Sequence, residues 1–170
     1  MKNNFTIETE RIILRPFTMN DVDEFAVICA DPEVMQFIGT GAPLDKETVQ
    51  QQMQSWIALY EKQGFGLLAL VWKENNRLLG FCGLMQQEVD GQTHIELGYR
   101  LEKAFWGKGI ATEAALAMRD YALMELSIPE LVSIIQLDNI ASKNVAKKVG
   151  MTHWKRTLFN GVLLDVFKLM

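Results

Sequence analysis

The chain has 170 residues, of which 49% are hydrophobic and 22% are charged. Both fractions are ordinary for a globular protein, so we expect one folded domain over residues 1–170. The formal net charge is −4, without any run of like charges. Because proteins that bind nucleic acid usually carry a basic surplus or stripe, the composition argues against a nucleic-acid partner.

Membrane, export and metal functions also find no support in the sequence. The longest apolar runs, such as residues 67–72, are far too short to span a bilayer. Residues Met1–Phe5 lack the apolar segment of a secretion signal. Cys29 and Cys82 do not make a disulfide framework, and their spacing from the histidines suggests no zinc site. We therefore expect a metal-free protein of the reducing cytoplasm, with no membrane partner.

The first third of the chain predicts one strand and two helices. Residues 11–17 form an apolar stretch that Pro16 interrupts, which is typical of a strand end. A helix follows with Thr18 or Asn20 as its N-cap, and it ends at Asp31-Pro32. A second helix starts near Asp45, with Gly64 as the residue that closes it.

The rest of the chain predicts a meander, two further helices and a final hairpin. The expected strands are 65–72, 78–89, 93–102, 131–137, 152–159 and 162–169, and the expected helices are 109–126 and 142–149. Asp90-Gly91 and Asn160-Gly161 are strong two-residue hairpin signals, because these residues tolerate positive φ. The predicted fold class is α+β, with helices packed on a mixed, mostly antiparallel sheet in the order βαα-βββ-α-β-α-ββ.

A strand is joined to the long helix through two closely spaced glycines, Gly107 and Gly109. Glycine has no Cβ, so successive backbone N–H groups can point at one anion. The first turn of the helix adds free N–H donors and the positive end of its dipole. Lys108 adds a full positive charge. Together these features indicate a diphosphate site.

Two familiar nucleotide loops do not match this turn. A Walker A loop needs Ser or Thr after Gly-Lys, whereas Gly109 follows Lys108. A dinucleotide fingerprint needs a glycine where Thr112 stands and a parallel βαβ unit around it. The structural alternative is that the glycines only permit a tight turn between strand and helix.

The segment Trp106-Gly107-Lys108-Gly109-Ile110-Ala111 resembles motif A of the GNAT superfamily of N-acetyltransferases, Gln/Arg-x-x-Gly-x-Gly/Ala before a long helix. Three further segments resemble the branch that contains the ribosomal-protein N-terminal acetyltransferases. They are its first strand at Thr9–Pro16, the continuation of motif A at Ala111–Ala114, and motif B from Asn139–Ser142 to Lys148–Met151. The resemblance spans essentially the whole chain.

The resemblance implies a GNAT-like fold, acetyl-CoA as co-substrate and no metal. It also implies a set of cofactor contacts, with main-chain contacts from the strand and backbone donors from the turn. The expected cofactor-binding residues are Tyr99, Leu101, Trp106, Gly107, Lys108, Gly109, Ile110, Ala111, Thr112, Asn139 and Ser142. Two positions depart from the family pattern: Trp106 replaces the usual Gln or Arg, and Ala146 replaces a tyrosine that often serves as general acid.

Glu96 and Ser142 are the candidate catalytic residues. Strand alternation places Glu96 with Arg100 on the polar face of the strand that leads to the turn, where a carboxylate could relay a proton from the amine through water. The alternative is a solvated carboxylate paired with Arg100. The family resemblance places Ser142 near the cofactor thiol and Asn139 against the cofactor, although both are also ordinary helix-start residues. Neither cysteine has a visible activating base, so an acyl-enzyme is not expected.

We expect the chain to transfer acetyl from acetyl-CoA directly to a primary amine. A protein N-terminal α-amine is the first candidate acceptor, and a polyamine, an aminoglycoside or an amino acid remain alternatives. The acceptor pocket is expected between Met35–Gly39 and the 158–163 hairpin. A catalytically silent acyl-CoA-binding module and a nucleotide-binding domain are rival interpretations, and a homodimer stays open.

Overall fold

The computed structural model describes residues 5–170. The expectation that the chain starts without a secretion signal falls mostly on Met1–Asn4, which lie outside the described residues. In the described chain, eight strands form one sheet in the order β1-β2-β3-β4-β5-β6-β8-β7. The strands are β1 (Ile7–Glu8), β2 (Ile12–Pro16), β3 (Leu67–Trp72), β4 (Leu78–Val89), β5 (Gln92–Leu101), β6 (Leu131–Gln136), β7 (Thr152–Phe159) and β8 (Val162–Leu169). All neighbours are antiparallel except β5 and β6.

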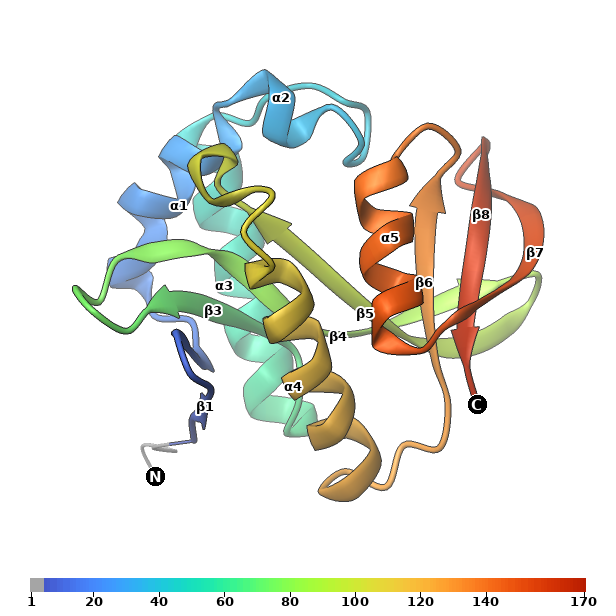
Figure 1. Cartoon of the computed structure of the whole chain (residues 1–170). Coiled ribbons are helices and arrows are strands. Elements are labelled where there is room, and N and C mark those ends of the chain that lie inside the picture. The colour runs from blue at the N-terminus through green and yellow to red at the C-terminus, as the bar shows by residue number, and fades with distance from the viewer. Residues whose placement is uncertain (1–4) are drawn as a thin grey trace.

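Helices cover both faces of this sheet. They are α1 (Val22–Cys29), α2 (Pro32–Met35), α3 (Lys46–Gln63), α4 (Ile110–Met124) and α5 (Ile140–Val149). Helices α4 and α5 lie on one face, whereas α1 and α3 lie on the other (Figure 1). The predicted α+β class and its mixed, mostly antiparallel sheet are confirmed.

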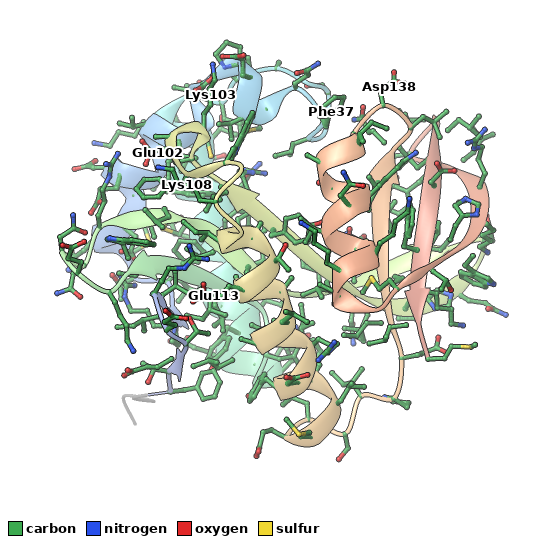
Figure 2. All side chains as sticks on the ribbon, in the orientation of Figure 1. Phe37, Glu102, Lys103, Lys108, Glu113 and Asp138 are labelled. Atoms are coloured by element: carbon green, nitrogen blue, oxygen red, sulfur yellow. The ribbon has the colours of Figure 1, made fainter. Side chains whose placement is uncertain are left out.

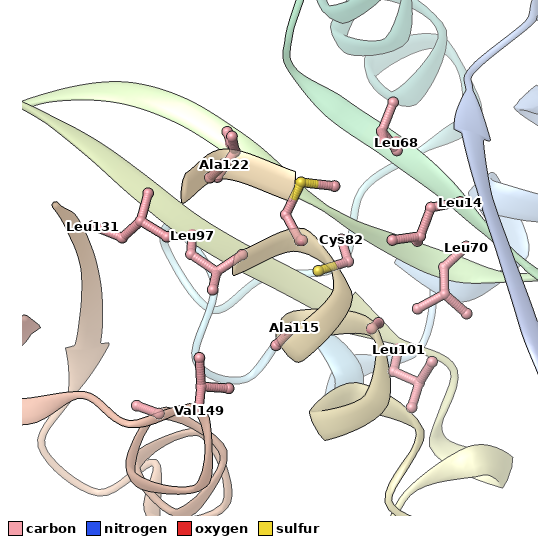
Figure 3. Packing of buried hydrophobic residues seen from close by; sticks show 14 of the residues in the cluster. Leu14, Leu68, Leu70, Cys82, Leu97, Leu101, Ala115, Ala122, Leu131 and Val149 are labelled. Carbon is pink, nitrogen blue, oxygen red and sulfur yellow. The ribbon is translucent and has the colours of Figure 1, made fainter. Parts of the chain in front are cut away.

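Side chains of β5 alternate between two layers of the core, one on each face of the sheet. Leu97 of β5 is packed with Ala115 of α4 and Val149 of α5 in one buried cluster (Figure 3). Arg100, three residues further along β5, points to the opposite face, where its guanidinium lies 5.5 Å from the ring of Phe25 in α1. A period of two along β5 therefore separates the two layers of the core.

All elements predicted from the sequence are present, with shifted ends and additions. The two-residue strand β1 and the single-turn helix α2 were not predicted. Asp31-Pro32, interpreted as a helix end, also starts α2: the Asp31 carboxylate accepts a hydrogen bond from the Glu33 N–H. Helix α5 starts at Ile140 rather than Ser142, because Asn139 is its N-cap. Both predicted hairpin turns are confirmed, with positive φ at Asp90-Gly91 and Asn160-Gly161.

Trp154 lies at the surface, although its large apolar ring would favour the core. Its residue is 39% exposed on the edge strand β7, and Lys155 and Lys168 lie over its ring at 4.1 and 4.4 Å. An exposed indole is stabilised there by cation–π contacts rather than by burial. Trp56 and Trp72 are half-buried against the core.

A buried carboxylate joins α5 to the last two strands. Asp165 of β8 is only 3% exposed and accepts hydrogen bonds from Arg156 Nε at 2.9 Å, Lys143 Nζ at 2.6 Å and His153 Nε2 at 3.1 Å. Lys143 Nζ also donates to the Leu137 carbonyl at 2.7 Å, which fixes the start of α5. The hydrogen bonds from Arg156 and Lys143 hold the pKa of Asp165 well below its ordinary value, against the opposing effect of burial.

We predict that Asp165→Asn lowers the free energy of unfolding at pH 7 by about 2 to 3 kcal/mol, because it leaves the largely buried Lys143 ammonium without its counter-charge and weakens the hydrogen bonds from Arg156 and His153. The folded-state pKa of Asp165 lies below the unfolded value of about 3.9. Its contribution is therefore present above that pH and is lost as pH falls through the folded value. Urea unfolding from pH 8 to below pH 4 should show a stability difference between parent and variant that is constant down to about pH 4 and shrinks below it. Asp138→Asn, at an exposed site on the same side of the molecule, is the control (Figure 2).

Candidate functional site

The sheet opens between its two parallel strands. Only one register pair joins β5 to β6, Glu96 with Val132, although both strands continue beyond it. The two strands diverge from there towards the ends that face α2 and the top of α5 (Figure 1). Ser133 spans the start of the gap, since its hydroxyl donates to the Leu97 carbonyl at 2.7 Å.

The open edge of β5 presents main-chain groups that β6 does not pair. Because the Leu97 carbonyl points towards β6, the N–H and C=O groups of Tyr99 and Leu101 point the same way, two and four residues further on. The Glu102 N–H donates to the Leu79 carbonyl of β4, which confirms that even-numbered residues face the other strand. Tyr99 and Leu101 were the residues expected to make main-chain contacts with the cofactor.

The glycine turn follows directly on this open edge. Gly107 and Gly109 have φ of 71° and 76°, a region that favours glycine. Gly109 is the N-cap of α4, so the N–H groups of the first helical turn, at Ile110, Ala111 and Thr112, lack intrahelical partners. These donors and the helix dipole make the turn suited to an anion.

The turn is held in place by the start of β2. Arg11 Nη1 donates to the Lys108 carbonyl at 2.9 Å, and Arg11 Nε donates to Glu113 at 2.7 Å. Thr9 Oγ1 donates to the same carboxylate at 2.6 Å. Burial alone would raise the pKa of Glu113, but the hydrogen bonds from Thr9 and Arg11 outweigh it and lower that pKa. Glu113, in the first turn of α4, is therefore a structural anion that braces the turn.

A cavity of about 310 Å³ lies between this turn, the end of β5 and α5. Ten of the eleven predicted cofactor-binding residues line it: Tyr99, Leu101, Trp106, Gly107, Gly109, Ile110, Ala111, Thr112, Asn139 and Ser142. The other, Lys108, is exposed and its ammonium lies 5.2 Å from the Phe105 ring, on the side of α4 away from α5 (Figure 2).

Two side chains at this cavity differ from what the sequence alone indicated. Trp106, at the position where the family usually has Gln or Arg, donates its indole N–H to the Leu101 carbonyl at 2.8 Å. Lys148 lines the cavity and was not predicted as a site residue. Its spacing from Ala141 and Val145, which also line the cavity, is that of one helix face, so the pattern was present in the sequence.

A second cavity of about 580 Å³ adjoins the first and shares six lining residues with it. The shared residues are Phe37, Ile38, Tyr99, Arg100, Asn139 and Ser142. The loop after α2 and the β7–β8 hairpin also line it, through Gly39 and Phe159 among others, where the acceptor pocket was expected. Figure 2 shows Phe37 on that loop, facing the gap towards α5.

Glu96 lies at the second cavity and is held by two donors. Gln87 Nε2 donates to Glu96 Oε2 at 2.9 Å, and the Ile134 N–H approaches Glu96 Oε1 at 3.4 Å. Burial raises the pKa of Glu96, and these hydrogen bonds only partly oppose the rise. The suggested pairing of Glu96 with Arg100 is wrong, because Arg100 instead donates to Cys29 Sγ at 3.1 Å. Four residues along a strand separate the two by roughly 13 Å.

Asn139 and Ser142 lie where the two cavities meet. The Ser142 N–H donates to Asn139 Oδ1 at 3.1 Å, so the Asn139 side chain caps α5. This bond uses the carbonyl oxygen and leaves the amide NH₂ as a donor. Tyr99 Oη donates to the Ser142 carbonyl at 2.9 Å and thereby ties α5 to the open edge of β5. Burial raises the pKa of the Tyr99 hydroxyl.

The described residues of the site do not include a reactive cysteine, a tyrosine at the motif B position or a cluster of metal ligands. Cys29 and Cys82 are both fully buried, and burial raises the pKa of each thiol. Ala146, at the usual tyrosine position, is packed in the core. Among residues 5–170, no group of three His, Cys, Asp or Glu side chains could hold a metal ion. Within the same range, every helix falls short of the length and apolarity needed to cross a membrane.

Comparison with known proteins gives consistent matches. A family model described as an acetyltransferase (GNAT) domain matches residues 11–152. The protein YkkB of Bacillus subtilis is 33% identical over 157 residues, which cover 88% of this chain and 86% of YkkB. A crystal structure of an acetyltransferase from Agrobacterium tumefaciens is 28% identical with a TM-score of 0.81, covering 100% of this chain and 96% of that one. A ribosomal-protein α-N-acetyltransferase solved with coenzyme A has a TM-score of 0.82 over 98% of both chains; at 17% identity it shows a shared fold.

The family match covers the glycine turn, the open edge of β5 and the start of α5, which together surround the first cavity. The geometry of these elements is a separate observation from the family match, and both indicate the same kind of site. The chain therefore belongs to the GNAT acetyltransferase family, and it is an acetyl-CoA-dependent N-acetyltransferase.

Proposed function

We propose that acetyl-CoA binds in the 310 Å³ cavity, with its pyrophosphate on the turn at residues 106–112 and its pantetheine arm along the open edge of β5. Three observations support this placement: the positive φ of both glycines, the free N–H groups at the start of α4, and the main-chain groups of Tyr99 and Leu101 that β6 does not pair. Acetyl-CoA supplies an acetyl thioester whose carbonyl carbon an amine can attack.

Two lysines are available to add positive charge to the phosphate end. Lys108 was predicted for this role from its place in the turn, and its exposed side chain can reorient towards a bound anion. Lys148 already lines the cavity from the last turn of α5. We assign the phosphate contact to the backbone donors first, since these are fixed before the ligand arrives.

The acceptor amine is proposed to enter the 580 Å³ cavity, where Glu96 assists its deprotonation. An amine must be neutral to attack a carbonyl carbon, and an α-amine has a pKa near ~8 whereas a lysine amine is near ~10.4. A carboxylate whose pKa is raised by burial holds a proton more readily at neutral pH, which suits a general base. This argument favours an α-amine as acceptor, on a protein N-terminus or on a small molecule.

The leaving thiolate needs a proton, and the usual tyrosine is absent because Ala146 replaces it. We propose Ser142 for this step, because it lines both cavities at the start of α5. Asn139, beside it, is proposed to donate its free amide hydrogen to the cofactor. Attack is proposed to be direct, since neither buried thiol can reach a substrate.

We further propose that residues 1–170 act as a single catalytic domain, since one continuous sheet carries the whole site. A cytoplasmic location is proposed as well. Both cysteines are free thiols, which is the usual state of cysteine in a reducing compartment.

The cofactor placement is tested by Gly109→Val, which we expect to abolish measurable CoA binding. A β-branched side chain cannot keep the φ of 76°, so the turn and its N–H groups must rearrange. Gly91→Val is the matched control: Gly91 has the same φ of 76° and open space around it, but it lies in the β4–β5 hairpin. Isothermal titration with CoA should therefore separate the two variants. Unchanged CoA affinity in a folded Gly109→Val protein would refute the placement.

The proposed base is tested by Glu96→Gln, which should lower kcat/KM by roughly 100- to 10,000-fold, since general-base assistance is typically worth that much. The rate of the parent enzyme should rise with pH as Glu96 loses its proton, and this rise should be absent in the variant. The measurement is kcat/KM against pH with a turned-over amine. Glu88→Gln, at an exposed site on β4, is the control. Activity within a few-fold of the parent across the range would make Glu96 a structural residue.

Direct transfer is tested by the double variant Cys29→Ala, Cys82→Ala. We expect it to keep most turnover, because both thiols are buried and outside the proposed chemistry. Initial rates with both substrates varied should give intersecting lines in parent and variant. Ping-pong kinetics, or an acetylated cysteine trapped by mass spectrometry, would contradict a ternary complex.

A further inference from the structure

Among residues 5–170, Arg100 is a buried cation without an anionic partner. Its residue is 8% exposed, and it forms no ion pair with any carboxylate of residues 5–170. The hydrogen bond that its guanidinium does make is to a poor acceptor, the Cys29 sulfur at 3.1 Å. The Nε atom is buried without any hydrogen-bond partner in the same part of the chain.

The surroundings hold the guanidinium in place but do not neutralise it. The rings of Phe81 and Phe25 lie 5.2 and 5.5 Å from the guanidinium carbon. Such cation–π contacts compensate a buried charge only in part, and buried charges in proteins are ordinarily paired. An arginine fork also offers five N–H donors in a plane that matches a carboxylate.

The unpaired guanidinium borders the proposed acceptor cavity. Phe81 and Met85 line that cavity, and they belong to β4, which is paired on both edges, so their side chains form the lining. Phe81 lies opposite Arg100 in the register and stacks against its guanidinium, and Met85 lies opposite Glu96. The floor of the cavity is thus the sheet face that carries Glu96, Gly98 and Arg100.

From this geometry we infer that Arg100 binds a carboxylate of the acceptor, so that the substrate is a primary amine that also carries a carboxylate. The inference rests on the proposed function, because it uses the same cavity and the same base. One face of β5 then presents a carboxylate, Glu96, towards the ammonium group and a guanidinium, Arg100, towards the acid group. A free amino acid or a peptide with an acidic side chain near its N-terminus supplies both groups.

The same charges disfavour the other acceptor classes. A polyamine or an aminoglycoside would bring further ammonium groups towards a guanidinium that is already desolvated. Like charges in a site of low dielectric repel strongly and reduce affinity. The acceptor preference of the enzyme should therefore follow the carboxylate, not the number of amines.

The test compares matched acceptors in acetyl-CoA turnover. One arm uses free L-amino acids and their carboxamides, and a second uses short peptides with Asp or Asn at the second position. Spermidine and an aminoglycoside complete the panel. The parent should show kcat/KM at least tenfold higher for the carboxylate member in one of the two arms, and that arm identifies whether the acid group is the α-carboxylate or a side chain.

Arg100→Met should reduce this carboxylate-to-amide ratio to near one, chiefly through KM. Methionine fits between two phenylalanine rings and removes an unpaired buried charge, so the variant is expected to fold with an unchanged or higher Tm. Arg100→Lys keeps the charge but loses the fork and should give an intermediate ratio. Arg77→Met is the control, since Arg77 also lies over a phenylalanine ring, at Phe105, but outside both cavities.

Four results would contradict the inference, and each would lead to a different conclusion. Turnover of spermidine or an aminoglycoside with no carboxylate preference would overturn the inference and leave acetyl transfer intact. An unchanged ratio in a folded Arg100→Met protein would assign Arg100 to structure. A weakened CoA affinity with an unchanged ratio would assign Arg100 to the cofactor. Absence of turnover with every amine in the panel, despite CoA binding, would refute the proposed function itself and the inference with it.

Discussion

The separation of β5 from β6 is the constraint on which the rest of the site depends. A parallel pair that continued in register would use the main-chain groups of Tyr99 and Leu101 within the sheet, and no ligand could reach them. Instead the pairing stops after Glu96 and Val132. At the start of the gap, side chains form the hydrogen bonds in place of strand pairing. The Ser133 hydroxyl donates to the Leu97 carbonyl, and the Glu96 carboxylate accepts from the Ile134 N–H. The opening is thus a stable feature with partly satisfied polar groups, and both cavities lie against it.

The elements around the opening are fixed from outside it. Arg11 and Glu113 brace the glycine turn against β2, and Asp165 connects α5 with the β7–β8 hairpin. The Tyr99 hydroxyl then joins the two sides of the opening through the Ser142 carbonyl. The charged residues of these clusters are not the residues proposed for catalysis. The site can therefore be preorganised while its proposed reactive residues remain available.

Local signals in the sequence were sufficient to predict most of the fold and most of the residues that line the 310 Å³ cavity. Paired glycines, hairpin dipeptides and strand alternation act over a few residues, so the turn at Gly107 and Gly109 and the faces of β5 could be predicted. The contacts that a buried side chain makes with segments far away in the sequence could not be predicted in this way. Arg100 looked like a partner for Glu96 because both lie on one face, whereas its actual contacts come from α1 and β4, some seventy and twenty residues away. The exposure of Trp154 could not be predicted for the same reason, since no local pattern marks β7 as the edge strand.

The absence of the motif B tyrosine changes where the chemistry must be sought. Ala146, on α5, is buried in the core cluster and has no hydroxyl that could donate a proton. The polar groups where the two cavities meet are those at the start of α5, since Asn139 and Ser142 border both cavities. Glu96 and Arg100 lie on one strand and one face, at the floor of the 580 Å³ cavity. Such a site separates the group proposed to receive the proton of the amine from the group proposed to protonate the thiolate. The proposed recognition of the acceptor then falls to charges on the sheet.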